Sequence, residues 1–299
     1  MQPHTLPRPP DHNQGSLPTT PFALGYGNLC ETDLRDNDVA NEGQRDFWGR
    51  TGMDAIWPHL EQVSDHGTPV LVDAAELTAG ERVLDVGCGG GKQTLALAEA
   101  VGPTGAVTGI DISERMISLA QSRVEQAGTS NVSVQVGDAQ TQTFDAGFDR
   151  VVSQFGCMFF DDPASAYANL CAALKPGGGL TCVVWQSADK MTWMPNRALQ
   201  TLMPEGESPI NPHALADPDY VRTLLGDAGF TDISSRELNV EAEVDDNFIQ
   251  DAFTLDMVPD EHKEQARHLI DQHKKSFRVG DKYRIQLPML VIRATKPSA

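Results

Sequence analysis

The sequence predicts an α/β protein built on a doubly wound, mostly parallel sheet. Residues 81–98 combine a short apolar strand pattern, a glycine-rich turn and a helical pattern. After this turn, further strand and helix patterns alternate along the chain. This alternation is typical of a parallel sheet with helices on both faces.

Local signals set the predicted elements. Ser113, Asp162 and Asp217 each stand at the N-cap of a helical pattern, and the last two are followed by proline at the first helical position. Two helices are predicted between residues 47 and 77. Alternating polarity in strand 131–136 predicts an edge strand. The predicted strands are 83–86, 107–111, 131–136, 148–153, 180–185, 230–243 and 283–293.

The glycine turn after the first strand predicts a ligand site. Glycine reaches positive φ at low cost and lets another molecule approach the main chain, and the following helix presents free N–H groups. A dinucleotide-binding G-x-G-x-x-G pattern would need glycine at position 92, where Lys92 stands. The glycines at 87, 89 and 91 follow Asp85, whose carboxylate would repel a pyrophosphate. Asp85 could accept a hydrogen bond from an ammonium group, directly or through water, which favours an amino-acid-bearing nucleoside over NAD.

Residues 83–91 resemble motif I of the class I S-adenosylmethionine-dependent methyltransferases. Four further segments follow in the order of that family, and the similarity covers about residues 44–295. The resemblance is strongest to small-molecule methylases of the ubiquinone/menaquinone type. It implies a Rossmann-like sheet of seven strands in the order 3-2-1-4-5-7-6. The four further segments are 107–111, 136–139, 148–153 and 174–179.

The resemblance also implies S-adenosylmethionine as the cofactor and assigns roles to two acids. Asp111 would take both ribose hydroxyls, and Asp138 would lie beside the adenine amino group. The alternative for Asp111 is a helix-capping carboxylate, but its distance of 20 residues from Gly91 within a βαβ unit suits a ribose partner. The alternative for the glycines is a tight turn without a ligand. The predicted cofactor-binding residues are Asp85, Gly87, Cys88, Gly89, Gly91, Gln93, Asp111, Ile112, Met116, Asp138, Ala139, Ser153 and Gln154.

The acceptor pocket is expected beyond the carboxyl ends of the strands, as in other open α/β sheets. The residues expected there are mostly aromatic or apolar, which favours a largely apolar or aromatic acceptor. Two of them, Trp48 and Trp57, resemble paired tryptophans of the family, although they could equally be core anchors. The predicted acceptor-binding residues are Trp48, Trp57, Phe155, Met158, Phe159, Trp185 and Trp193.

Methyl transfer depends mainly on positioning, so the sequence need not contain an obligatory catalytic side chain. If a general base is used, the candidates are His59, His66 and His268. The fourth strand ends in Ser153-Gln154-Phe155-Gly156, which differs from the Asn/Asp-Pro-Pro-aromatic motif of amine methylases. Cys157 does not follow a proline, so we interpret it as a packing residue. The predicted reaction is methylation of O, N or C in a small metabolite.

Two rival functions are compatible with the same motifs. One is a cyclase, isomerase or decarboxylase that uses S-adenosylmethionine, and the other is a non-catalytic binding protein. Product analysis for S-adenosylhomocysteine would separate the first rival from a methyltransferase. The second rival should show degraded glycines or acids, and none is degraded here.

Composition sets the expected organisation. Residues 1–22 are proline-rich and polar and are predicted to be disordered, residues 23–78 to form a helical lid segment, and residues 79–299 the catalytic domain. Within that domain, an insertion at about 244–280 is expected to form a cap.

Charge and cysteine content exclude several partners. The net charge of −19 and the lack of an extended basic cluster argue against nucleic acid and anionic membranes. The five cysteines show no metal-site or disulfide spacing, so no metal is expected. No signal peptide or membrane span is recognised, which predicts a cytoplasmic protein. The oligomeric state and the acceptor's identity are left open.

Overall fold

The structure is a computed structural model that describes residues 40–202, 211–248, 255 and 258–298. The predicted disordered tail, residues 1–22, lies outside the described residues, as do residues 23–39 of the predicted lid segment.

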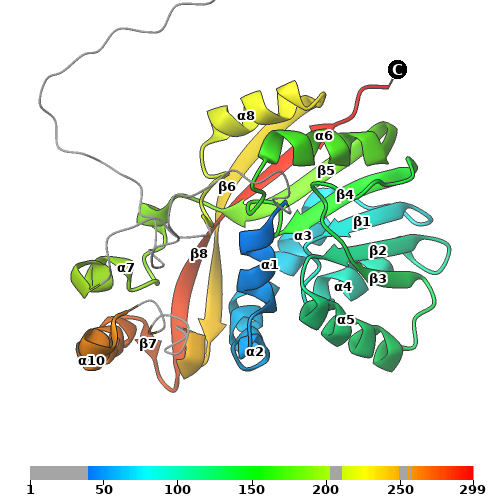
Figure 1. Cartoon of the computed structure of the whole chain (residues 1–299). Coiled ribbons are helices and arrows are strands. Elements are labelled where there is room, and N and C mark those ends of the chain that lie inside the picture. Colours follow the sequence, from blue (N-terminus) through cyan, green and yellow to red (C-terminus); the bar gives the residue numbers. More distant parts are fainter. Residues whose placement is uncertain (1–39, 203–210, 249–254, 256–257, 299) are drawn as a thin grey trace, which may run out of the picture.

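A single mixed sheet forms the centre of the molecule, with strand order β3-β2-β1-β4-β5-β8-β6 (Figure 1). The first five of these strands are parallel, and β8 pairs antiparallel to β5 and β6. The predicted order 3-2-1-4-5-7-6 is therefore confirmed, with β8 as the seventh long strand. The two-residue strand β7 pairs with β8 and was not predicted. The strands are β1 (Arg82–Val86), β2 (Ala106–Asp111), β3 (Val132–Val136), β4 (Phe148–Gln154), β5 (Leu174–Trp185), β6 (Thr231–Val244), β7 (Arg278–Val279) and β8 (Lys282–Thr295).

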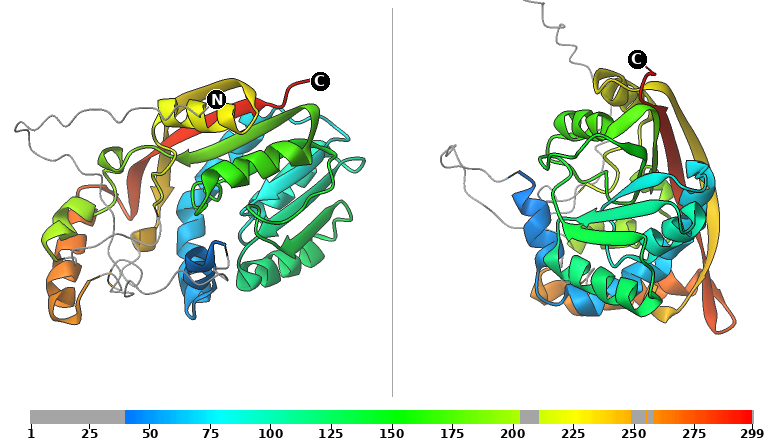
Figure 2. Two further views of the ribbon diagram at one scale, coloured as in Figure 1. Left: turned by 45° about the horizontal axis from the view of Figure 1, so that its top comes forward. Right: turned by 90° about the vertical axis from the view of Figure 1, so that its right-hand side faces the viewer.

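Helices cover both faces of the sheet, as the alternation of patterns predicted (Figure 2). Neighbouring residues of β1 point to opposite faces. Val83 packs in one core cluster with Leu71 and Leu97, and Leu84 packs in another with Leu170. Thus α3 and α4 cover one face, whereas α6 and α8 cover the other. The helices that pack on the sheet are α3 (Thr68–Ala75), α4 (Lys92–Val101), α5 (Glu114–Ala127), α6 (Pro163–Ala173) and α8 (Pro218–Asp227).

The predicted helix starts are confirmed. The side chains of Ser113, Asp162 and Asp217 accept backbone N–H groups of the first turns of α5, α6 and α8. Gly128 at φ 63° ends α5, in the left-handed conformation that glycine adopts most readily. Local chain chemistry therefore sets these helix boundaries.

The N-terminal segment forms three helices where two were predicted. It contains α1 (Glu42–Gly49), α2 (Met53–Ser64), the 3-10 turn η1 (Asp65–Gly67) and α3. Arg50 is extended and Gly52 has φ 92°, so the backbone leaves the helical conformation between α1 and α2. Apolar residues from Phe47 to Ile56 keep helical spacing across this break, so the sequence pattern predicted one helix where the structure has α1 and α2.

The strands β6 and β8 extend past the parallel strands (Figure 1). The helices α7 (Asn196–Leu199) and α10 (Lys263–Lys275) lie together near that end of the two strands. Part of the predicted cap, residues 249–254 and 256–257, lies outside the described residues. Its described part contains a helix, as expected, and its role as a cap stays a prediction. The elements here are η2 (Ala188–Lys190), α7 (Asn196–Leu199), η3 (Gln200–Leu202), η4 (Asp246–Phe248), η5 (Asp260–His262) and α10 (Lys263–Lys275).

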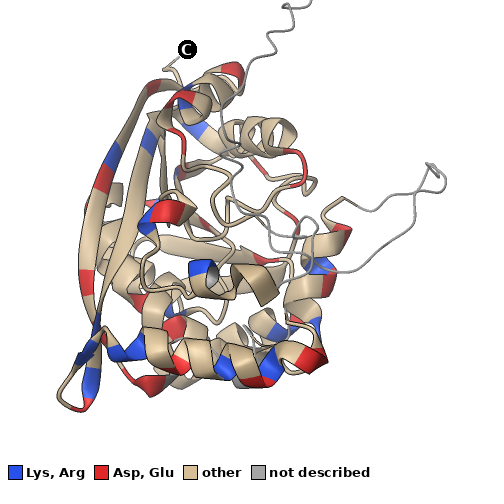
Figure 3. Cartoon of the chain, turned by 90° about the vertical axis from the view of Figure 1, so that its left-hand side faces the viewer, with Lys and Arg blue, Asp and Glu red and all other residues tan. Residues whose placement is uncertain are grey.

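Figure 3 shows that Lys and Arg are interspersed with Asp and Glu over the helices and long strands on one side of the molecule. In the described part of the chain, no helix is long and apolar enough to cross a membrane. The predicted absence of a nucleic-acid partner and the cytoplasmic location stay predictions.

Candidate cofactor and acceptor site

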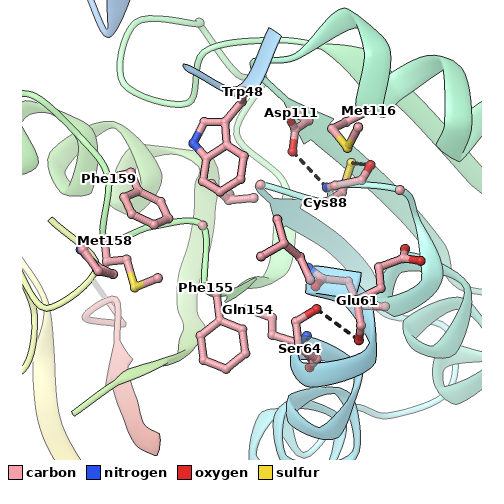
Figure 4. Close-up of a pocket in the computed structure, with 18 of the residues that line it drawn as sticks. Trp48, Glu61, Ser64, Cys88, Asp111, Met116, Gln154, Phe155, Met158 and Phe159 are labelled. Carbon is pink, nitrogen blue, oxygen red and sulfur yellow. Dashed lines mark hydrogen bonds between the residues drawn. The ribbon is translucent and has the colours of Figure 1, made fainter. Parts of the chain in front are cut away.

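A cavity of about 310 Å³ lies at the carboxyl ends of β1, β2, β4 and β5, where the sequence placed the site. Its wall includes the glycine turn, the strand ends and residues of α1 and α2. Figure 4 shows Asp111 and Met116 on one side, Met158 and Phe159 on the other, and Trp48 between them. The cavity therefore has an acidic half near the glycine turn and an aromatic half after β4 and β5.

The glycine turn after β1 leaves no room for a Cβ atom at its three glycines of positive φ. Gly87, Gly89 and Gly91 all have positive φ. A Cβ on Gly87 would lie 2.8 Å from the Cα of Gly156, and a Cβ on Gly89 would lie 2.6 Å from the Trp57 ring. The turn thus packs against the loop after β4 and against α2, while its backbone borders the cavity.

Asp111 stands at the end of β2 and borders the acidic half of the cavity. One carboxylate oxygen accepts the backbone N–H of Gly89 and the other that of Ser113, both at 2.9 Å. Burial raises the pKa of Asp111, and these two N–H groups partly oppose the rise. Each oxygen has a further lone pair with which it could accept a ligand hydroxyl.

Asp138 follows β3 and borders the same half. Its Oδ1 accepts hydrogen bonds from Asn41 Nδ2 at 2.8 Å and from the backbone N–H of Gln140 at 2.9 Å. Its Oδ2 is buried and has no hydrogen-bond partner among the described residues. A buried carboxylate oxygen without a partner is costly, so Oδ2 is suited to a ligand N–H donor.

Asp85 is fully buried and does not border the cavity. Its two oxygens accept hydrogen bonds from Gln93 Nε2 at 2.5 Å and Thr94 Oγ1 at 2.7 Å, both on α4. Burial raises the pKa of Asp85 to about 7, although these two bonds oppose the rise. Asp85 could therefore influence a ligand ammonium only indirectly, through Gln93, which does border the cavity.

Stacked rings form the aromatic half. Phe155, at the end of β4, stacks on Trp185 with ring centroids 3.9 Å apart and planes at 12°. Trp185 contacts Trp193 edge-on at 6.4 Å, and Trp193 lies 6.5 Å from Phe248. Phe155 has φ 55°, which is rare for a side chain of this size. The end of β4 holds this backbone conformation beside the cavity, where strained residues are often found.

An ionic cluster attaches α2 to the glycine turn. Arg123 of α5 donates to both oxygens of Glu61 and to the Gly90 carbonyl oxygen, and Lys92 lies 3.2 Å from Glu61. Burial would raise the pKa of Glu61, but the hydrogen bond from Arg123 and the charges of Arg123 and Lys92 lower it below its usual value. Lys92 also bonds Asp65 at 2.7 Å. The cluster holds α2, and with it Trp57, over the turn.

Comparisons with known proteins identify the family. Residues 77–225 match a family model described as a methyltransferase domain. Nocamycin O-methyltransferase of Saccharothrix syringae is 33% identical over 189 residues, which cover 58% of this chain and 67% of that protein. The chain belongs to this methyltransferase family. The family prediction made from the motifs is thus confirmed.

A second curated relative matches over a shorter length, and a solved structure shares the fold. Aklanonic acid methyltransferase DauC of Streptomyces sp. (strain C5) is 42% identical over 109 residues, 36% of this chain and 50% of that protein. The chain spans about half the length of that relative. Phosphoethanolamine N-methyltransferase 2 of Haemonchus contortus, solved with S-adenosyl-L-methionine, has a TM-score of 0.58 at 19% identity, covering 85% of this chain and 60% of that one. This likeness establishes the class I methyltransferase fold.

Within this methyltransferase fold, most of the predicted residues border the cavity. All seven residues predicted for the acceptor do so. Trp57 packs on Gly89 and Gly90 of the glycine turn. The Trp48 carbonyl oxygen accepts from the Ser113 hydroxyl and its ring lies 5.6 Å from that of Phe159, so Trp48 stands between the two halves. The predicted cofactor residues that border the cavity are Gly87, Cys88, Gly89, Gly91, Gln93, Asp111, Ile112, Met116, Asp138, Ala139 and Gln154.

Four predicted residues do not border it. The first is Asp85, and the second is Ser153, which is buried. The Ser153 hydroxyl donates to the Val86 carbonyl oxygen and accepts the Cys157 N–H, so it links β4 to β1. His66 lies in η1 and is not part of the cavity wall. His268 is exposed on α10 and bonds Gln272. His59, of the predicted bases, does border the cavity.

Several residues of the cavity wall were not predicted, and two of them, Asn41 and His213, have side chains that bear on the chemistry of the site. Asn41 joins Asp138 to the loop after β4, because its Oδ1 accepts the Asp161 N–H at 2.8 Å. His213 borders the aromatic half, in a turn between η3 and α8. The Asn211-Pro212 pair is typical of a turn, but no spacing in the sequence connects that turn with the site. In the described residues, no group of three or more His, Cys, Asp or Glu could hold a metal ion.

Gly89→Ala should both destabilise the protein and weaken ligand binding at the turn. The positive φ alone costs about 1–2 kcal/mol for a residue with a Cβ, and contact with Trp57 adds about 1–3 kcal/mol of overpacking. Gly128→Ala is the matched control, because Gly128 has φ 63° but open space around it. Urea unfolding of both variants measures the difference, and equal losses would show that Trp57 moves aside freely.

Proposed function

We propose that the protein is an S-adenosylmethionine-dependent methyltransferase that acts on a small, largely apolar or aromatic acceptor. The observation that carries the proposal is that a glycine turn and two acids line the same cavity as a set of stacked aromatic rings. One half suits a polar nucleoside and the other an apolar acceptor.

The residues of the acidic half fit this cofactor. Asp111 would accept the ribose hydroxyls, and the unpartnered Oδ2 of Asp138 would accept the adenine amino group. The glycine turn leaves room for the ligand beside the backbone. Bound there, S-adenosylmethionine supplies a methyl group on a sulfonium sulfur that a nucleophile can displace. The cavity's own carboxylates and aromatic faces suit a cationic group.

The aromatic half would hold the acceptor. Phe155, Trp185 and Trp193 offer flat apolar faces, and packing against them would exclude water and orient the acceptor atom. Such positioning contributes up to about 7–11 kcal/mol in model reactions. The names of the relatives, which include an O-methyltransferase and demethylmenaquinone methyltransferases, support methyl transfer over the cyclase, isomerase, decarboxylase and binding-protein alternatives. The intact glycines and acids also argue against a non-catalytic protein.

Calorimetry tests the cofactor directly. S-Adenosylmethionine and S-adenosylhomocysteine should bind with low-micromolar or tighter dissociation constants, and NAD should give no heat at the same concentrations. The reason is the 87, 89, 91 glycine spacing, with Lys92 engaged by Glu61 and Asp65. Binding of NAD without a response to either sulfur compound would refute the proposal.

A further inference from the structure

His213 borders the cavity beside the end of β5, and the protein backbone engages one of its two ring nitrogens. Its Nδ1 lies 2.6 Å from the Gln186 backbone carbonyl oxygen. A carbonyl oxygen can only accept, so Nδ1 carries the proton and donates it. In the neutral ring, Nε2 then carries the lone pair, and it has no partner among the described residues. The backbone at the end of β5 thus fixes both the tautomer and the orientation of this imidazole.

The surroundings keep His213 neutral near pH 7. Burial lowers its pKa, opposed in part by the hydrogen bond to Gln186 and by the charge of Asp189. Asp189 and Lys190 lie on the adjacent turn η2, and Lys190 is bonded to the Gln186 side chain and to Glu237. A neutral imidazole with a free Nε2 is able to take up a proton.

The described residues of the cavity wall offer no free cation to an anionic acceptor. Among the described residues that border it, Lys92 is the single Lys or Arg, and its ammonium is already bonded to Glu61 and Asp65. The other charged residues of the wall are acids: Glu61, Asp65, Asp111 and Asp138. With S-adenosylhomocysteine bound, whose sulfur carries no charge, a carboxylate placed against the aromatic rings would be buried without a positive side chain beside it, which is costly. A neutral hydroxyl compound has no such penalty.

We propose that the acceptor is a neutral phenolic or enolic hydroxyl compound and that His213 is the catalytic base that takes its proton. This proposal rests on the proposed methyltransferase function. The hydroxyl O–H bond breaks and its proton passes to Nε2, which leaves an imidazolium. The oxygen forms a bond to the methyl carbon as that carbon's bond to sulfur breaks, with the electron pair remaining on sulfur. The imidazolium later returns its proton to water.

Binding of three matched naphthalenes tests the substrate class. Protein loaded with S-adenosylhomocysteine is titrated with 1-naphthol, 1-methoxynaphthalene and 1-naphthoate at pH 7.5. Naphthol should bind about three- to tenfold more tightly than methoxynaphthalene, which cannot donate a hydrogen bond. Naphthoate should bind at least about tenfold more weakly than naphthol. Equal or tighter binding of naphthoate, or no binding of naphthol, overturns the proposal.

Two substitutions separate binding from proton transfer. In His213→Phe the preference for naphthol over methoxynaphthalene should disappear. In His213→Gln the side-chain oxygen can still accept a hydrogen bond, so the preference should remain while methylation of 1-naphthol falls about 10²- to 10⁴-fold. His262→Gln is the control, because His262 does not border the cavity, and should retain wild-type rates. Two results would contradict the role of His213 as the catalytic base: full turnover by His213→Gln, or a wild-type protein that does not methylate 1-naphthol.

A pH profile gives a further readout. Wild-type kcat should rise with pH through an apparent pKa below the usual 6.5 of histidine and then level off, because protonated His213 cannot accept a proton. In His213→Gln, kcat should not show this rise with pH. Binding of S-adenosylhomocysteine to wild type and both variants separates the two proposals. If it is retained while the naphthol results fail, the hydroxyl acceptor and the role of His213 are wrong but the proposed function stands. If wild type does not bind it, the proposed function fails.

Discussion

Replacing Asp111 with alanine should weaken S-adenosylmethionine binding by about 10²- to 10⁴-fold. The carboxylate would make two hydrogen bonds to the ribose hydroxyls, and hydrogen bonds to charged groups contribute about 1.5–3 kcal/mol each. A factor of ten in affinity corresponds to about 1.4 kcal/mol. Alanine would also release the backbone N–H groups of Gly89 and Ser113, so the glycine turn would lose its support.

Two further variants provide comparisons for the effect of Asp111→Ala. Ser113→Ala leaves the Asp111 carboxylate in place but removes the cap of α5, and it should change affinity little. Asp138→Ala removes a single expected contact in the same half of the cavity, so its loss should be smaller, about 10- to 100-fold. Isothermal titration with folded variants measures all three. An unchanged dissociation constant for Asp111→Ala would show that this residue only ties the turn to α5.

The sequence could predict that the residues of the acidic half lie together, because strand register sets their positions nearly independently of distant contacts. Asp111 ends β2, and β2 pairs in parallel with β3 so that Asp111 lies opposite Val136, two residues before Asp138. Parallel strands end at one edge of the sheet, so residues that follow each strand converge there. A motif and its order along the chain are then sufficient to bring Asp111, Asp138 and the glycine turn together.

The position of Asp85 was less well predicted, although the sequence held the needed signal. Side chains alternate along a strand, so Asp85 shares a face with Val83, and that face is covered by α4. Its carboxylate therefore bonds to Gln93 and Thr94 and does not reach the cavity.

The position of His213 could not be predicted from the sequence. It lies in an irregular turn that tertiary packing brings to the end of β5, and no local periodicity reports such a contact.

The burial of Asp85 should make the protein less stable as pH rises from 5 to 8. The pKa of Asp85 is about 7 in the folded protein, whereas that of an aspartate in an unfolded chain is about 3.9. Between these values the folded state holds the proton and the unfolded state has lost it. Stability therefore falls with increasing pH in this window, by about 1.4 kcal/mol per unit, and the loss is complete above the folded pKa.

Asp85→Asn should remove this pH dependence without removing the hydrogen bonds. The asparagine oxygen can accept from Gln93 Nε2, and its amide can donate to Thr94 Oγ1, which is also able to accept. The free energy of unfolding of wild type minus that of Asp85→Asn should therefore decrease by about 2–3 kcal/mol between pH 5 and pH 8. Urea titrations without cofactor at several pH values measure it.

Asp149→Asn provides the matched control for the Asp85 measurement. Burial would raise the pKa of Asp149, but hydrogen bonds from the Arg82 backbone and from Lys175 lower it below its usual value. Asp149 is then ionised in both folded and unfolded states above pH 5, so its difference curve should be flat where that of Asp85 slopes. A flat curve for Asp85→Asn as well would mean that Gln93 and Thr94 are sufficient to hold a buried carboxylate in its charged form. In that case Asp85 would add a negative charge behind the glycine turn, and its attraction for a ligand ammonium would act through the wall of the cavity.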